Sequence, residues 1–190
     1  MGTANPQLCA AETSQLVVID VQVRLMAAMP PEARERVVKN TGILLQAARL
    51  LLLPVVATEQ YPKGLGATEA ALAQHFPENL DVVCKTCFAS SGAAGFDATL
   101  DAHQGRHQLI LTGMEAHVCV LQTALELLGR GYQVFVVEDA VSSREDANRH
   151  NAMMRLRQAG AIITNTESVL FEWLRDASHP QFKAVTALIK

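Results

Sequence analysis

The feature that most constrains the fold is a run of β-branched and aliphatic residues, LVVID, at 16–20. It lacks the alternation of apolar and polar residues that marks a strand with one face in water. A strand that is apolar on both faces is typical of a parallel sheet covered by helices on both sides. The runs PVVAT at 54–58 and HQLILTG at 107–113 predict further strands. We therefore expect a mostly parallel sheet.

Between the strands, apolar residues recur at the spacing of amphipathic helices. The clearest example begins at Pro30 and ends before Pro54. Ser142 and Glu145 have the spacing of a capping box, which predicts a helix running from there to 160. The rest of the pattern predicts helices at 68–76, 118–129 and from 167, strands at 80–85, 132–139 and 161–165, and a loop at 89–95. This alternation predicts one α/β domain, residues 1–190, with right-handed crossovers.

Composition limits the classes of partner. The 16 Lys and Arg residues are interleaved with 19 Asp and Glu residues, for a net charge of -3, so we expect no binding to nucleic acid or to an anionic membrane surface. A neutral small molecule is the expected partner. The first residues show no signal-peptide pattern, and the run LLLPVVA is too short to span a bilayer. Four cysteines are too few and too unevenly spaced for a disulfide framework, which favours a cytoplasmic location.

Three residues with reactive side chains follow predicted strands. Asp20 ends the first strand, Lys85 ends the apolar segment 80–85, and Cys119 lies in the first turn of the helix after the strand at 107–113. Parallel sheets bind ligands at the carboxyl ends of their strands, so these side chains are candidates for one catalytic site. We expect the helix start to lower the pKa of the Cys119 thiol from about 8.5.

Each candidate also has a purely structural interpretation. Asp20 could cap a loop or pair with Arg24, and Lys85 could extend along the surface with its ammonium group in water. Cys119 could be an inert buried thiol, since free cysteine is among the most buried residue types. Because an acid, a cation and a thiol are predicted at one edge of the sheet, the catalytic interpretation of the set is favoured.

A family resemblance supports this choice. Asp20 in LVVIDVQ, Lys85 in VCKTCF and Cys119 in TGMEAHVCVLQTALELLGRG resemble, in order and spacing, the signature segments of the isochorismatase-like cysteine hydrolase superfamily. The resemblance extends to the isochorismatase domain-containing proteins through TEQYPKGLG at 58–66, EDAVSSR at 138–144 and HPQFKAVTALIK at 179–190. It covers nearly the whole chain.

The resemblance implies a three-layer, Rossmann-like, doubly wound sheet with helices on both faces. It also implies a catalytic triad in which Cys119 attacks an acyl carbon, Asp20 transfers the proton, and Lys85 holds the two in place. The oxyanion would be bound by backbone N–H groups of Cys119 and Glu115. The family carries a non-proline cis peptide at the position of Met114–Glu115.

The sequence departs from the family's nicotinamidases. These bind a divalent metal through an Asp-x-His pair and a further His after the second strand, whereas this chain reads TEQY at 58–61. We therefore expect no metal, no other cofactor and no nicotinamidase activity. The predicted substrate-binding residues are Gln60, Tyr61, Phe88 and His117. We do not expect His117 to act as a base for Cys119, because residues two apart on a helix do not face each other.

The leading hypothesis is a metal-independent cysteine hydrolase that cleaves a C–N bond of a small amide. One alternative is an oligomeric binding or scaffold protein with a vestigial site. Another is a redox protein that uses Cys84 and Cys87 of CKTC, although this pair leaves a strand and has no second ligand pair for zinc. Family members usually assemble, so we expect a homo-oligomer, a dimer or larger, and the apolar segment AVTALIK at 184–190 is a candidate interface.

Overall fold

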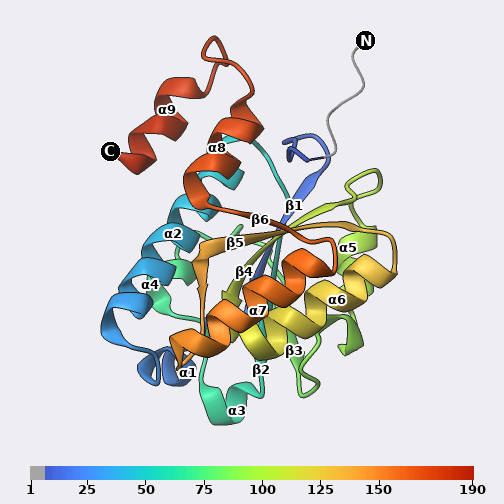
Figure 1. Cartoon of the computed structure of the whole chain (residues 1–190). Helices are drawn as coiled ribbons and strands as arrows, with labels where there is room; N and C mark the ends of the chain where they lie inside the picture. The colour runs from blue at the N-terminus through green and yellow to red at the C-terminus, as the bar shows by residue number, and fades with distance from the viewer. Residues whose placement is uncertain (1–6) are drawn as a thin grey trace.

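The computed structural model describes residues 7–190 and contains one sheet of six parallel strands (Figure 1). The strand order is β3-β2-β1-β4-β5-β6, so the order reverses between β1 and β4. The strands are β1 Ser14–Ile19, β2 Val55–Gln60, β3 Val83–Lys85, β4 Gln108–Met114, β5 Gln133–Ser142 and β6 Ile162–Thr164. In such a doubly wound sheet, the carboxyl ends of β1 and β4 border the crevice in which ligands bind.

Helices cover both faces of the sheet, and Figure 1 shows α6 and α7 side by side over one of them. The helices are α1 Val23–Ala27, α2 Pro31–Leu50, α3 Pro62–Leu65, α4 Ala70–Ala73, α5 Phe96–Asp101, α6 Leu121–Gly129, α7 Asp146–Gln158, α8 Thr166–Leu174 and α9 Phe182–Thr186. Two 3₁₀ turns, η1 Ser90–Gly92 and η3 Ala187–Ile189, and one π-helical turn, η2 Ala116–Val120, complete the list. The turn η2 continues directly into α6.

Strand β1 shows why the sheet is apolar on both faces. Leu16 and Val18 belong to the core formed with α2 and α8, whereas Val17 and Ile19 belong to the core formed with α5, α6 and α7. All four side chains are buried. The prediction of a parallel sheet buried on both sides is thus confirmed. No helix within residues 7–190 is both long enough and apolar enough to cross a membrane.

The predicted capping box at Ser142 is wrong. Strand β5 continues through Ser142, which pairs with Met114 of β4, and α7 begins only at Asp146. Glu145 occupies the N-cap position without a side-chain capping bond. The sheet extends here because two apolar residues, Ala140 and Val141, are buried in the cores on its two faces.

Two other segments differ from expectation. The helix predicted at 68–76 shrinks to the single turn α4, and the short helix α5 was not predicted. The apolar tail at 184–190 packs on the chain itself, since Val185 is fully buried in the core and Leu188 and Ile189 contact it. The tail is therefore a weaker candidate for an interface than its composition indicates.

Gly113 allows β1 and β4 to approach each other next to the crevice. Its φ is +112°, and a Cβ built on it would lie 1.9 Å from the carbonyl oxygen of Ile19. We expect Gly113→Ala to lower the free energy of unfolding by roughly 3 kcal/mol or more, because backbone would have to move. Chemical denaturation measures this. Gly129→Ala is the control: a Cβ there meets no atom within 4 Å, so an equal loss in both variants would contradict the prediction.

Candidate active site

The carboxylate of Asp20 and the ammonium group of Lys85 form a buried ion pair at the carboxyl edge of the sheet. Lys85 Nζ lies 2.6 Å from Asp20 Oδ2, and neither side chain has solvent-exposed area. Thr58 Oγ1 donates a hydrogen bond to the other carboxylate oxygen of Asp20 at 2.7 Å. Asp20 directly follows β1, and Thr58 and Lys85 lie in the neighbouring strands β2 and β3, so the strand order itself brings them together.

Lys85 is held by further acceptors. Its Nζ donates to Gln60 Oε1 at 2.7 Å and contacts the carbonyl oxygens of Phe88 at 3.1 Å and Cys87 at 3.3 Å. A buried charge is costly unless it is paired and hydrogen-bonded, and this ammonium group satisfies both conditions. Its position is therefore fixed, and the interpretation of Lys85 as an extended surface residue is excluded.

The thiol of Cys119 completes the cluster from the other side of the crevice. Cys119 lies in η2, directly after β4, and is buried. Asp20 and Lys85 both lie near enough to the thiol to act on its pKa, Asp20 raising it and Lys85 lowering it. The acid, the cation and the thiol predicted from separate strand ends therefore meet at one place.

The expected lowering of the thiol pKa is wrong. Burial is the largest effect, and together with the negative charge of Asp20 it raises the pKa of Cys119 to about 12, although Lys85 acts in the opposite direction. A helix start favours the thiolate, but loss of water and a neighbouring carboxylate disfavour it more strongly here. A pKa raised in this way favours the neutral thiol of Cys119, next to the side chain of Asp20.

The backbone at Glu115 shapes the turn that presents the thiol. The Met114–Glu115 peptide bond is cis, as the family resemblance implies. The carbonyl oxygen of Glu115 accepts hydrogen bonds from the N–H groups of Val118 at 3.0 Å and Val120 at 3.2 Å. These two bonds close the chain around Cys119 and fix where its side chain points.

The four predicted substrate-binding residues differ in their surroundings. Gln60 uses its side chain within the protein, because Oε1 accepts from Lys85 and Nε2 donates to the carbonyl of Thr86 at 2.8 Å. Tyr61 and Phe88 are exposed large side chains. His117 is partly buried and its Nδ1 lies 2.9 Å from Ser143 Oγ.

Sequence reasoning missed two residues that organise this site. Thr58 bonds Asp20, and Gln22 bonds the backbone of Gln60, with Gln22 Oε1 accepting from Gln60 N at 2.8 Å and Gln22 Nε2 donating to Gln60 O at 3.0 Å. Both are buried polar residues. Gln22 follows Asp20 in the DVQ segment, and Thr58 ends the predicted strand at 54–58, so position at a strand end was the available signal.

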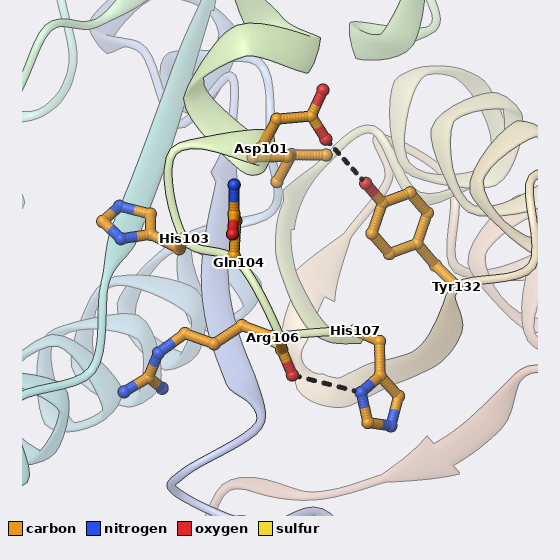
Figure 2. A pocket seen from close by; sticks show the side chains of 8 residues that line it. Asp101, His103, Gln104, Arg106, His107 and Tyr132 are labelled. Atoms are coloured by element: carbon orange, nitrogen blue, oxygen red, sulfur yellow. Dashed lines mark hydrogen bonds between the residues drawn. The ribbon is translucent and has the colours of Figure 1, made fainter.

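Two hollows lie at opposite edges of the sheet. One of about 410 Å³, next to the ion pair, is lined by Tyr61, Pro62, Lys63, Cys84, Lys85 and Thr86. The other, of about 470 Å³, lies at the amino ends of β4 and β5, and Figure 2 shows Asp101, His103, Gln104, Arg106, His107 and Tyr132 around it. The second hollow is far from Cys119 along the strands, so it is not part of the candidate site.

The cysteines of CKTC lie outside this cluster. Cys84 is exposed, Cys87 is half-buried, and both are free thiols. Within residues 7–190, no group of three or more His, Cys, Asp or Glu side chains is placed to hold a metal ion.

The chain is similar to known proteins over most of its length. A family model described as the Isochorismatase domain matches residues 14–168. Isochorismatase domain-containing protein 2 of Bos taurus is 43% identical over 155 residues, which cover 82% of this chain and 74% of that protein.

Solved structures are similar over almost the whole chain. A MAR1 ribonuclease from Caenorhabditis elegans has a TM-score of 0.89 and 39% identity, and covers 96% of this chain and 92% of its own. The YcaC gene product of Escherichia coli, an octameric hydrolase of unknown specificity, has a TM-score of 0.87 and 25% identity. The match covers 96% of the present chain and 89% of the YcaC chain. YcaC from Pseudomonas aeruginosa with hexane-2,5-diol and covalent acrylamide has a TM-score of 0.87 and 26% identity. This match covers 98% of the present chain and 93% of that YcaC chain.

The buried ion pair predicts a large effect of removing one partner. Lys85→Met leaves the Asp20 carboxylate buried without a counter-charge, and we expect the free energy of unfolding to fall by about 3–5 kcal/mol. Urea denaturation at pH 7 measures this. The double variant Asp20→Asn/Lys85→Met should lose less than the single variant, because it leaves no unpaired buried charge.

The pair of Arg149 and Asp146 on α7, in which the Asp146 side chain is 77% exposed, gives the matched control for this measurement. Arg149→Ala should cost less than about 1 kcal/mol. If Lys85→Met costs no more than Arg149→Ala, the ion pair does not have the role assigned to it.

Proposed function

The chain belongs to the isochorismatase family, and from this premise we propose that it is a metal-independent cysteine hydrolase that cleaves the C–N bond of a small amide. The observation that carries the proposal is a buried thiol, Cys119, whose pKa is shifted by the ion pair of Asp20 and Lys85 beside it. A nucleophile, a general base and a fixed cation are the parts that amide hydrolysis through a covalent intermediate requires.

In the first half-reaction, Sγ of Cys119 bonds to the carbonyl carbon while its proton moves to Asp20. The negative charge on the carbonyl oxygen is stabilised by the backbone N–H groups of Glu115 and Cys119. When the tetrahedral adduct collapses, the C–N bond breaks and Asp20 gives its proton to the departing amine. A thioester and a free amine result.

In the second half-reaction, a water molecule attacks the thioester carbon and gives a proton to Asp20. The C–S bond then breaks, the carboxylic acid leaves, and the proton returns to Sγ. Asp20 is thus base and acid in turn, which requires that it stay ionised between turnovers. Lys85 holds the carboxylate in place through the ion pair.

The raised pKa of Cys119 fits this sequence of steps. A neutral thiol next to a carboxylate becomes nucleophilic only as its proton is transferred, so the attack and the proton transfer are coupled. Covalent acrylamide in Pseudomonas aeruginosa YcaC gives further support, since acrylamide is a small neutral amide and an alkylating agent of thiols. We propose that the substrate-side residues Tyr61, Phe88 and His117 contact an amide of similar size.

A second candidate function comes from the Caenorhabditis elegans neighbour, which is described as a ribonuclease. The present chain has a net charge of -3 with interleaved signs. RNA binding depends mainly on clustered positive charge that contacts phosphates. The amide hydrolase is therefore preferred, and RNA serves as the comparison substrate.

We further propose a homo-oligomer in the cytoplasm. The octameric state of Escherichia coli YcaC supports the assembly. The lack of a disulfide framework among the four free cysteines fits a reducing compartment.

The hydrolase proposal predicts that turnover depends on one thiol. Wild-type protein should release amine from members of a panel of small neutral amides, and Cys119→Ala should lower this rate by a factor of about 10³ or more while keeping the fold. The exposed Cys84 supplies the control, since Cys84→Ala should retain the rate. Unchanged turnover in Cys119→Ala would exclude the mechanism. RNA cleavage without amide cleavage would favour the second candidate, and an inert wild type would favour a vestigial site.

The role of Asp20 can be tested without a substrate, because two effects of the same side chain oppose each other. Asp20→Asn removes the charge that helps raise the pKa of Cys119, which alone would speed its alkylation. It also removes the base, which would slow alkylation. We expect acrylamide to modify Cys119 at least about tenfold more slowly in Asp20→Asn at pH 7, because general base catalysis contributes about 10²–10⁴-fold.

Mass spectrometry of each cysteine measures this rate, and the exposed Cys84 in the same sample is the internal reference. Near-ultraviolet circular dichroism checks that the variant is folded. Faster modification of Cys119 in Asp20→Asn would mean that Asp20 only suppresses the thiolate.

A further inference from the structure

The segment after β5 contacts the turn that carries the thiol through two pairs of side chains, and neither of these side-chain contacts is used in the steps above. Arg144 contacts Glu115, and Ser143 contacts His117. Ser143 and Arg144 end the segment EDAVSSR at 138–144. The contacts join the carboxyl end of β5 to that of β4, next to Cys119.

The pair of Glu115 and Arg144 has the geometry of a clamp. Glu115 Oε1 accepts from the backbone N–H of Arg144 at 3.1 Å and from its Nε at 3.1 Å, and Oε2 accepts from Nη2 at 3.3 Å. The Glu115 side chain is 8% exposed, whereas that of Arg144 is 61% exposed. A buried carboxylate held at both oxygens has little freedom to rotate.

Glu115 transmits this constraint to the thiol through its backbone. Its carbonyl oxygen accepts hydrogen bonds from the N–H groups of Val118 and Val120, the two neighbours of Cys119 in the chain. A change in the orientation of Glu115 would therefore move the first turn of the helix. The bond of His117 Nδ1 to Ser143 Oγ, at 2.9 Å, holds the same turn at a second point.

We propose that Arg144 is a positioning residue of the active centre: it clamps the Glu115 carboxylate and so fixes the turn that places the Cys119 sulfur and the backbone N–H groups opposite Asp20. The inference rests on the proposed function and adds to it a residue outside the triad. Arg144 itself contacts no reacting atom.

Arg144→Ala tests the proposal, and because the side chain is largely exposed we expect the variant to fold. It should lower kcat for the amide substrate about tenfold with KM changed less than about twofold, a smaller effect than the roughly hundredfold loss that a 1 Å displacement of a catalytic group can cause. Acrylamide should modify Cys119, relative to Cys84, more slowly by a similar factor. Arg144→Lys keeps the charge but cannot bond both carboxylate oxygens in the same way, so it should give an intermediate rate.

Two further measurements separate positioning from a general loss of structure. Guanidinium ion at low millimolar concentration should partly restore kcat of Arg144→Ala, since the vacated position opens to solvent, and should not raise kcat of the wild type. Arg149→Ala, which removes an arginine paired with the exposed Asp146 on α7, should behave like the wild type in every assay.

The outcomes distinguish this inference from the proposed function. If wild-type Cys119 is selectively modified and active but Arg144→Ala retains the wild-type rates, the positioning role is wrong and the hydrolase stands. A rise in KM alone would also overturn it, because it would mean that Arg144 binds substrate. If wild-type Cys119 shows neither turnover nor selective modification, both proposals fall.

Discussion

The buried ion pair of Asp20 and Lys85 is the interaction on which the site depends. It links three neighbouring strands, because Asp20 directly follows β1, Lys85 ends β3, and Thr58 of the intervening β2 bonds the same carboxylate. Two charges without exposed area would oppose folding by several kcal/mol each if they were alone. Here the ammonium group has the carboxylate, Gln60 and two backbone carbonyls as partners. The pair is tolerated because strand order, register and local loops all place acceptors around one nitrogen.

On the other side of the crevice, the thiol is positioned by backbone rather than by charge. Gly113 lets β4 pass close to β1, and Glu115 closes the turn over Cys119. The result is a thiol whose pKa is raised, not lowered, by burial and by Asp20. Such a site does not store a thiolate in advance. Under the proposed mechanism, the nucleophile would instead form during the reaction, as the proton moves from Cys119 to Asp20.

Much of this could be predicted from the sequence, and the limits have physical causes. Asp20, Lys85 and Cys119 were identifiable because parallel strands bring their carboxyl ends to one edge, and each residue follows an apolar run. The sign of the thiol pKa change was not predictable, because the helix start is a local feature whereas burial and the contact with Asp20 arise only in the folded chain. The capping box at Ser142 failed for a similar reason, since pairing with β4 outweighs a local capping preference. The bonds of the Gln60 side chain to Lys85 and Thr86 arise only in the folded chain, and no sequence pattern indicates them.

The pairing of charges also bears on what the site can accept. Asp20 is paired with Lys85 and Glu115 with Arg144, so each of these four charged side chains has a partner of opposite sign in the part of the chain that the structure describes. An anionic substrate would have to compete with the carboxylate already bonded to Lys85 or Arg144. Displacing that carboxylate would leave it buried without a counter-charge, which is unfavourable. A neutral amide avoids this cost, because its carbonyl needs only backbone N–H groups and its apolar part can contact exposed aromatic side chains such as Tyr61 and Phe88. The electrostatics of the site and the charge balance of the whole chain therefore favour the same class of substrate.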